Sequence, residues 1–207
     1  MDTIVVACSM LEDEIRRVMQ EEQLQYEIRW LDRGLHQSPE LLHTKVQHAI
    51  EELEQDHDEI LLCYGFCGNA LRNLRASGAV LAAMRCDDCI HMLLPGRVDS
   101  RSLYFTGGWI RSDKFIGEEY QACLEKYGER KTKRIYQTIL REYNCLYMVD
   151  TGAYDLEQYI PKAMKAADCL ALQFIITNGS IDILRKLLTH RWDQDIVMAG
   201  PGMPLNW

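Results

Sequence analysis

Three cysteines each follow a predicted buried strand in this 207-residue chain. Cys8 ends the segment TIVVAC, Cys67 lies in the turn after EILLC, and Cys89 comes a few residues after VLAAM. The carboxyl ends of parallel strands form the ligand-binding edge of an open α/β sheet. If these strands are neighbours, the three thiols lie in one crevice. Grouped thiolates bind soft metal ions such as zinc, or an iron–sulfur cluster.

Two further cysteines, Cys63 and Cys86, leave alternatives to this metal site open. The pair Cys86-x2-Cys89 matches half of a zinc ribbon or a redox dithiol motif. A redox dithiol opens a helix after a strand, as this pair is predicted to do, so a dithiol redox role competes with metal binding. In a third interpretation all five cysteines are buried packing residues. If zinc is bound, the candidate fourth ligands are Asp88, His91, Cys63 and Cys86.

Polar side chains near the thiols could act on a small-molecule substrate. Arg85 could hold an anionic group, and Tyr64 could donate a hydrogen bond in the crevice. Asp88 is either a general base or the N-cap of the helix that follows it. These three residues are the catalytic candidates.

Three other residues are candidates for contact with a cofactor. Gly65 and Gly68 flank Cys67 and predict a tight turn in which the backbone closely approaches another group. Trp109 follows two glycines and is predicted either to wall the crevice or to pack in the core.

Apolar runs alternate with segments of helical period along the chain. They predict an α/β fold with a mostly parallel, Rossmann-like sheet that has helices on both faces. The whole chain, 1–207, is treated as a single domain, and an inserted helical hairpin at 114–143 is a possible subdomain. A short helix is expected after Asn69. The expected strands are 3–8, 26–31, 59–63, 80–84, 103–106, 146–149, 170–176 and 195–198.

Composition narrows the functional class. The net charge of −8 argues against a nucleic-acid-binding protein, which would more often present a basic face. No apolar run reaches the roughly 20 residues that span a bilayer, and the first residues lack a basic leader. We therefore expect a cytoplasmic protein without membrane contact. In that compartment the eight cysteines are free thiols, metal ligands or redox groups. Cys123, Cys145 and Cys169 are assigned to packing.

Five segments carry a resemblance to a known family: VACSML, YGFCGNAL, RCDDCIHMLLPG, LYFTGGWI and GSIDILRKLL. In this order they resemble the domain-of-unknown-function family 1638 of anaerobic bacteria and archaea, over nearly the whole chain. The family pattern keeps the cysteines that match Cys8, Cys67 and Cys89, but not Cys63 or Cys86. Asp87 stands where the family usually has histidine. Family members are often encoded near corrinoid methyltransferases.

The residues and the resemblance together predict a metalloprotein that holds zinc or an iron–sulfur centre at Cys8, Cys67 and Cys89. The resemblance implies a role in methyl-group or one-carbon metabolism. One alternative is a metal-free accessory or scaffold protein for a corrinoid or methyltransferase partner. The other is a dithiol redox protein that uses Cys86 and Cys89.

Overall fold

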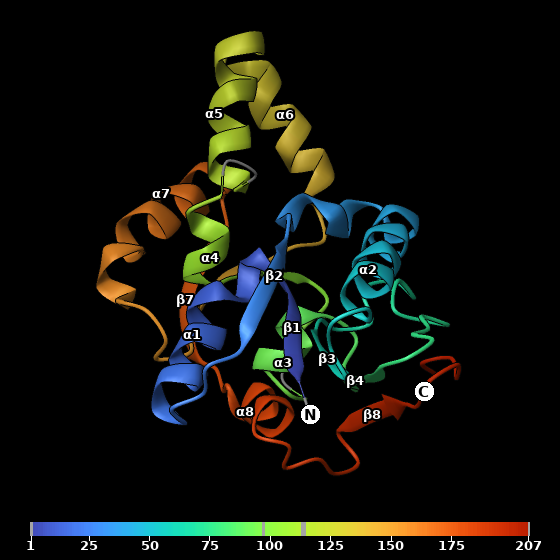
Figure 1. Cartoon of the computed structure of the whole chain (residues 1–207). Coiled ribbons are helices and arrows are strands. Elements are labelled where there is room, and N and C mark those ends of the chain that lie inside the picture. The colour runs from blue at the N-terminus through green and yellow to red at the C-terminus, as the bar shows by residue number, and fades with distance from the viewer. Residues whose placement is uncertain (1, 97, 113–114, 207) are drawn as a thin grey trace. The chain divides into compact units, whose positions relative to one another are not determined.

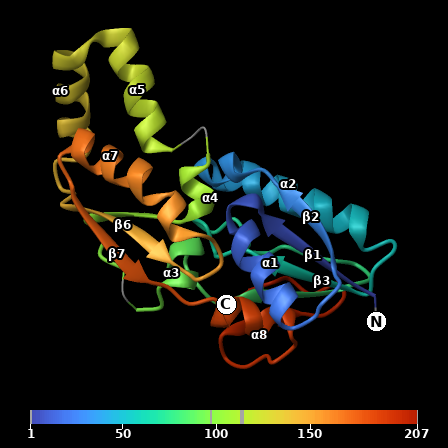
Figure 2. The same cartoon turned by 90° about the vertical axis from the view of Figure 1, so that its left-hand side faces the viewer.

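The computed structural model describes residues 2–96, 98–112 and 115–206. The chain divides into two compact units where the sequence was treated as one domain (Figures 1 and 2). Unit 1 is Met1–Gly96 with Ser180–Trp207, and unit 2 is Arg97–Gly179. The fold class is α/β, as predicted, but the strands form two sheets.

The sheet of unit 1 has five strands in the order β2-β1-β3-β4-β8, and the first four are parallel. β8 runs antiparallel to β4 at the edge. The register pairs Ala7 with Cys63 and Leu62 with Ala83, so the carboxyl ends of β1, β3 and β4 lie side by side. The adjacency on which the predicted thiol site depends is therefore present. The strands are β1 (Thr3–Cys8), β2 (Glu27–Leu31), β3 (Glu59–Cys63), β4 (Val80–Met84) and β8 (Ile196–Ala199).

Helices cover both faces of this sheet, which explains why β1, β3 and β4 are continuous apolar runs. α2 (Pro39–Leu53) begins at the N-cap Ser38, whose hydroxyl accepts a hydrogen bond from the Leu41 amide. Its buried stripe packs on the face that carries Ile4, Val6 and Leu62. α1 (Glu12–Glu21) and α8 (Asp182–Leu188) contact each other, and α8 also contacts β3 and β4. The remaining helical segments are the 3-10 turns η1 (Ser9–Leu11) and η2 (Arg33–Gln37), and α3 (Cys89–Leu93).

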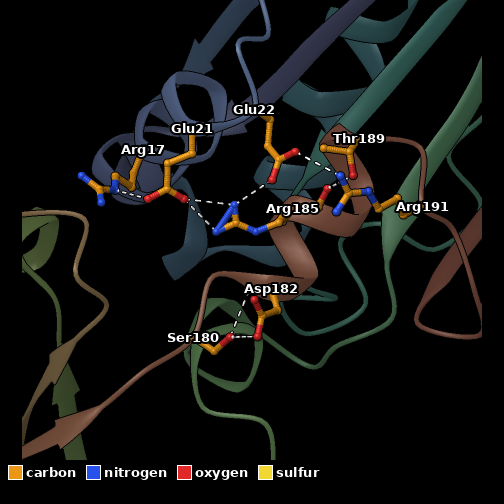
Figure 3. Close-up of polar contacts among 8 residues, drawn as sticks. All are labelled: Arg17, Glu21, Glu22, Ser180, Asp182, Arg185, Thr189 and Arg191. Atoms are coloured by element: carbon orange, nitrogen blue, oxygen red, sulfur yellow. Dashed lines mark hydrogen bonds and ion pairs between the residues drawn. The ribbon is translucent and has the colours of Figure 1, made fainter.

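Ion pairs hold α8 against α1 (Figure 3). The Arg185 guanidinium contacts the carboxylates of Glu21 and Glu22 at 2.8 and 3.0 Å. Glu22 also pairs with Arg191 at 3.2 Å, and Glu21 with Arg17 at 2.6 Å. A connected network of this kind fixes geometry better than isolated surface pairs do. It sets the position of α8, which lines a pocket described below.

Unit 2 is a three-stranded parallel sheet in the order β5-β6-β7, with helices packed on its core. α5 and α6 form the hairpin expected between residues 114 and 143, joined at Gly128, whose φ is +75°. The strands are β5 (Ser102–Phe105), β6 (Cys145–Asp150) and β7 (Gln173–Asn178). The helices are α4 (Gly107–Ile110), α5 (Ile116–Tyr127), α6 (Glu129–Ile139), η3 (Leu156–Gln158) and α7 (Ile160–Leu170).

Two predicted elements differ from the structure. The short helix expected after Asn69 is a series of turns, because Asn69 and Asn73 both adopt positive φ and interrupt any helix. The strand expected from residue 170 begins at Gln173, because α7 continues to Leu170 and is closed by Ala171 in the left-handed conformation. None of the described helices is long and apolar enough to cross a membrane.

Candidate thiol site

The loops that follow β3 and β4 are bonded to each other along their backbones. The Phe66 amide donates to the carbonyl oxygen of Cys86 at 2.7 Å, and the Cys67 amide donates to that of Asp87 at 2.8 Å. A Cβ added at Gly65 would lie 2.5 Å from the Cα of Asp88. Only glycine fits at this position. The close approach predicted at Gly65 is therefore made to the chain's own backbone.

The turn that carries Cys67 is conformationally demanding. Cys67, Gly68 and Asn69 all have positive φ, at +45°, +68° and +74°. A left-handed conformation costs a non-glycine residue about 1–2 kcal/mol, so the surrounding contacts must impose it at Cys67. One of these contacts is at Gly68, where an added Cβ would come within 3.0 Å of Pro39 at the start of α2. The turn holds the Cys67 thiol in a defined place.

Cys8 and Cys67 lie together on the face of the sheet that α2 covers. Both are partly buried and pack against the same apolar cluster, which includes Tyr64. Burial, and then the nearby charges of Cys8 and Asp88, raise the pKa of the Cys67 thiol to about 12. Burial also raises the pKa of Cys8, partly offset by the Met10 amide and Arg33. These thiols are neutral at pH 7 and close enough to influence each other.

Cys86 joins this pair through Cys67. Burial, and then the charges of Cys67 and of two aspartates, raise the pKa of Cys86 to about 12. Cys63 is different, because it alternates with Leu62 and Tyr64 along the chain and is completely buried. Cys63 is therefore a core residue, whereas Cys8, Cys67 and Cys86 form the thiol group. The sequence left Cys86 open, and its CxxC spacing from Cys89 was the signal that could have pointed to it.

Tyr64 places a hydroxyl among these sulfurs. The side chain is 3% exposed, and no hydrogen-bond partner for its oxygen exists in the described part of the chain. Burial, and then Cys8, Cys67 and Cys63, raise the pKa of this phenol well above its ordinary value. A buried polar group without a partner costs about 1–3 kcal/mol. The hydroxyl is therefore available to a group bound at the thiols.

Removing the Tyr64 hydroxyl is expected to stabilise the metal-free protein. Tyr64→Phe abolishes an unsatisfied buried group, and we expect a gain of about 1 kcal/mol in the free energy of unfolding. Tyr26→Phe is the matched control, because the Tyr26 hydroxyl donates to the carbonyl oxygen of Leu188 at 3.0 Å and its loss should destabilise. Urea denaturation measures both. If both variants lose the same free energy of unfolding, the Tyr64 hydroxyl has a hydrogen-bond partner in the folded protein.

Asp88 is the N-cap of α3. Its Oδ1 accepts from the amides of Ile90 and His91 at 2.8 and 2.9 Å, and it also contacts Nδ1 of His91 at 2.9 Å. These contacts bear out the capping interpretation. Cys89 begins α3 and is partly buried. Its membership of the metal site stays a prediction.

Arg85 and Trp109 are the two remaining side chains that the sequence singles out as candidates. Arg85 is exposed, and its amide donates to the carbonyl oxygen of Asp195 at 2.7 Å. Trp109 belongs to unit 2, where it packs against the apolar core and meets Phe105 edge-on, with ring centroids 6.3 Å apart. Its contacts within unit 2 agree with the core-packing alternative, and its role as a wall of the crevice stays a prediction.

The thiol group does not have the arrangement of a preformed metal centre. Within residues 2–96, 98–112 and 115–206, no set of three or more His, Cys, Asp and Glu side chains is placed to hold a metal ion. All eight cysteines are free thiols. The sulfurs would have to move toward one another to bind a metal.

One protein-family model matches the chain. It is described as "Protein of unknown function (DUF1638)" and covers residues 30–188, which is more than half of the sequence. The match includes the loops that carry Cys67, Cys86 and Cys89. No curated protein and no solved structure gives a significant match.

Proposed function

The chain belongs to the DUF1638 family, and from this premise we propose that it is a metalloprotein whose site is built on Cys8 and Cys67, with Cys86 or Cys89 as the third thiol. The family's description names no activity, so the thiol group has to support the function. A small-molecule substrate would bind against the same group. A role in methyl-group or one-carbon metabolism, with a corrinoid or methyltransferase partner, rests on the resemblance alone.

The observation that carries the proposal is the Tyr64 hydroxyl beside the sulfurs, which has no hydrogen-bond partner among the described residues. Neutral thiols are weak hydrogen-bond acceptors and leave this donor unsatisfied. A bound cation would displace the thiol protons, and its positive charge would offset the repulsion between the resulting thiolates. The hydroxyl would then gain a strong acceptor, either a thiolate or a group bound to the metal. Such outer contacts orient ligands and tune metal sites.

Three cysteine thiolates can hold either of two metal centres. Zinc held by three thiolates keeps a fourth position for water or substrate, which is the arrangement of a catalytic site. An iron–sulfur cluster with three cysteine ligands leaves one iron open to a further ligand. In both cases the chain's own groups would position a substrate, with Tyr64 as the hydrogen-bond donor nearest the sulfurs.

The dithiol redox alternative has less support. A redox dithiol works through a thiolate whose pKa is lowered by a helix N-terminus or a nearby cation. Burial and the surrounding negative charges instead raise the pKa of Cys86 to about 12. A thiol in this state is a poor nucleophile until a metal displaces its proton.

Metal analysis of anaerobically purified protein tests the proposal. We expect one centre per chain, with broad visible absorbance for an iron–sulfur cluster, or bound zinc without colour. Cys145→Ala, which alters a partly buried thiol at the start of β6 in unit 2, should bind as much metal as the unaltered chain. Protein that stays metal-free and colourless, even after incubation with Zn²⁺ or with Fe²⁺ and sulfide, would leave the metal-free scaffold as the function.

A further inference from the structure

A pocket of about 440 Å³ lies in unit 1 beside the segment Arg85–Asp87. Its other walls come from α3, from α8 and from Asp195. Two backbone hydrogen bonds hold these walls together. The Arg85 amide donates to Asp195, and the Ser180 amide donates to the carbonyl oxygen of Leu93 at 2.8 Å. The volume falls within the range of about 300–1,000 Å³ that is typical of small-molecule sites.

One cation in this pocket has no counter-ion among the residues that the structure describes. The ammonium group of Lys186 contacts the carboxylates of Asp193 and Asp195 at 2.7 and 2.5 Å, so its charge is neutralised. The Arg85 guanidinium makes no hydrogen bond or ion pair with the described residues. A guanidinium presents parallel N–H donors that match a carboxylate. Arg85 is therefore free to bind an anionic group.

Two carboxylates in the same pocket also lack a paired cation in the described part of the chain. Asp87 forms no ion pair within the described ranges, and the carboxylate of Asp182 accepts from the Ser180 hydroxyl at 2.8 Å. Their charges would repel a phosphate group with two negative charges. A ligand that carries both an anion and a cation would satisfy all three groups. Met92 and Ile183 add apolar surface for its carbon skeleton.

We propose that this pocket binds a small zwitterion, with its carboxylate on Arg85 and its ammonium group against Asp87 and Asp182. The ligand class is that of a free amino acid. Cys86 lines the same pocket and interacts with Cys67, so a bound ligand would lie beside the thiol group. The idea that this ligand is a substrate of the metal centre rests on the proposed function. The binding of the ligand in the pocket does not depend on it.

Saturation-transfer NMR on the full chain tests the proposal, with a mixture of the twenty standard amino acids as the probe. We expect transfer to at least one of them. The amine and the carboxylic acid that correspond to this amino acid, each lacking one charge, should bind at least tenfold more weakly. No transfer to any amino acid would overturn the proposal. If the amine, the acid or inorganic phosphate binds as tightly as the amino acid does, the assignment as a zwitterion site would also be overturned.

Arg85→Gln should weaken binding of the amino acid at least tenfold. Arg72→Gln is the control, because Arg72 is also an exposed arginine of unit 1 but lies outside the pocket. Undiminished binding in Arg85→Gln would contradict the proposal. Metal content is measured in the same samples. Lost amino-acid binding with unchanged metal separates the pocket from the metal site, and absent metal with retained amino-acid binding would contradict only the proposed function.

Discussion

Replacing Cys67 by serine is expected to abolish metal binding while the fold persists. The Cys67 loop is held by backbone hydrogen bonds to Cys86 and Asp87 and by the close approach of Gly68 to Pro39, and serine leaves both unchanged. A serine hydroxyl is a hard, protonated oxygen and a poor substitute for a thiolate on a soft metal. Metal per chain after anaerobic purification should fall to background, and the thermal unfolding midpoint should shift by only a few degrees.

The control variants lie in unit 2. The Cys123 sulfur accepts a hydrogen bond from the Thr132 hydroxyl at 3.6 Å, and Cys169 packs against the core of that unit. Cys123→Ala and Cys169→Ala should keep full metal content and lose about 1 kcal/mol of stability, as for a small core truncation. Unaltered metal in Cys67→Ser would remove this thiol from the site. Comparing Cys86→Ser with Cys89→Ser identifies the third ligand.

The sequence was sufficient to place the strand ends on which the site depends. The predicted ranges 3–8, 59–63 and 80–84 match β1, β3 and β4, because each is an apolar run that stops at a cysteine, an arginine or a polar turn. Their adjacency was a condition of the predicted site, and the pairing of β1 with β3 and of β3 with β4 meets it. The capping role of Asp88 was one of two interpretations, and its position directly before α3 was already visible in the sequence.

Other features depend on contacts between distant segments, which no local pattern reveals. Asn69 and Asn73 could have continued a helix, but the native turns place both in left-handed conformations. The chain forms two sheets because β5, β6 and β7 pair only with one another. The thiol group gained Cys86 because the loop after β4 is bonded to the Cys67 loop. The spacing of Cys86 and Cys89 marks Cys86 as a candidate thiol, but it does not indicate that Cys86 lies beside Cys67.

Substituting Gly65 tests whether the loops that follow β3 and β4 pair with each other. An alanine Cβ at this position would lie 2.5, 2.6 and 2.8 Å from the Cα, carbonyl carbon and nitrogen of Asp88. These are backbone atoms and cannot rotate away, so the loops must separate. We expect Gly65→Ala to lose about 3 kcal/mol in the free energy of unfolding, at the upper end for an overpacked site. Urea denaturation of the metal-free protein measures this loss.

Gly78→Ala is the matched control for Gly65→Ala in the same unit. An added Cβ there would meet only the carbonyl oxygen of Glu54, at an ordinary contact distance of 3.8 Å. Without a clash, alanine restricts the unfolded chain and should change stability by less than about 1 kcal/mol, with a gain as the expected sign. Because the displaced Asp88 backbone adjoins Asp87, which holds the Cys67 amide, Gly65→Ala should also lower metal content, and Gly78→Ala should not. Wild-type stability in Gly65→Ala would mean that the two loops are not in contact in solution, and the thiol group would then lack the support that brings Cys86 to Cys67.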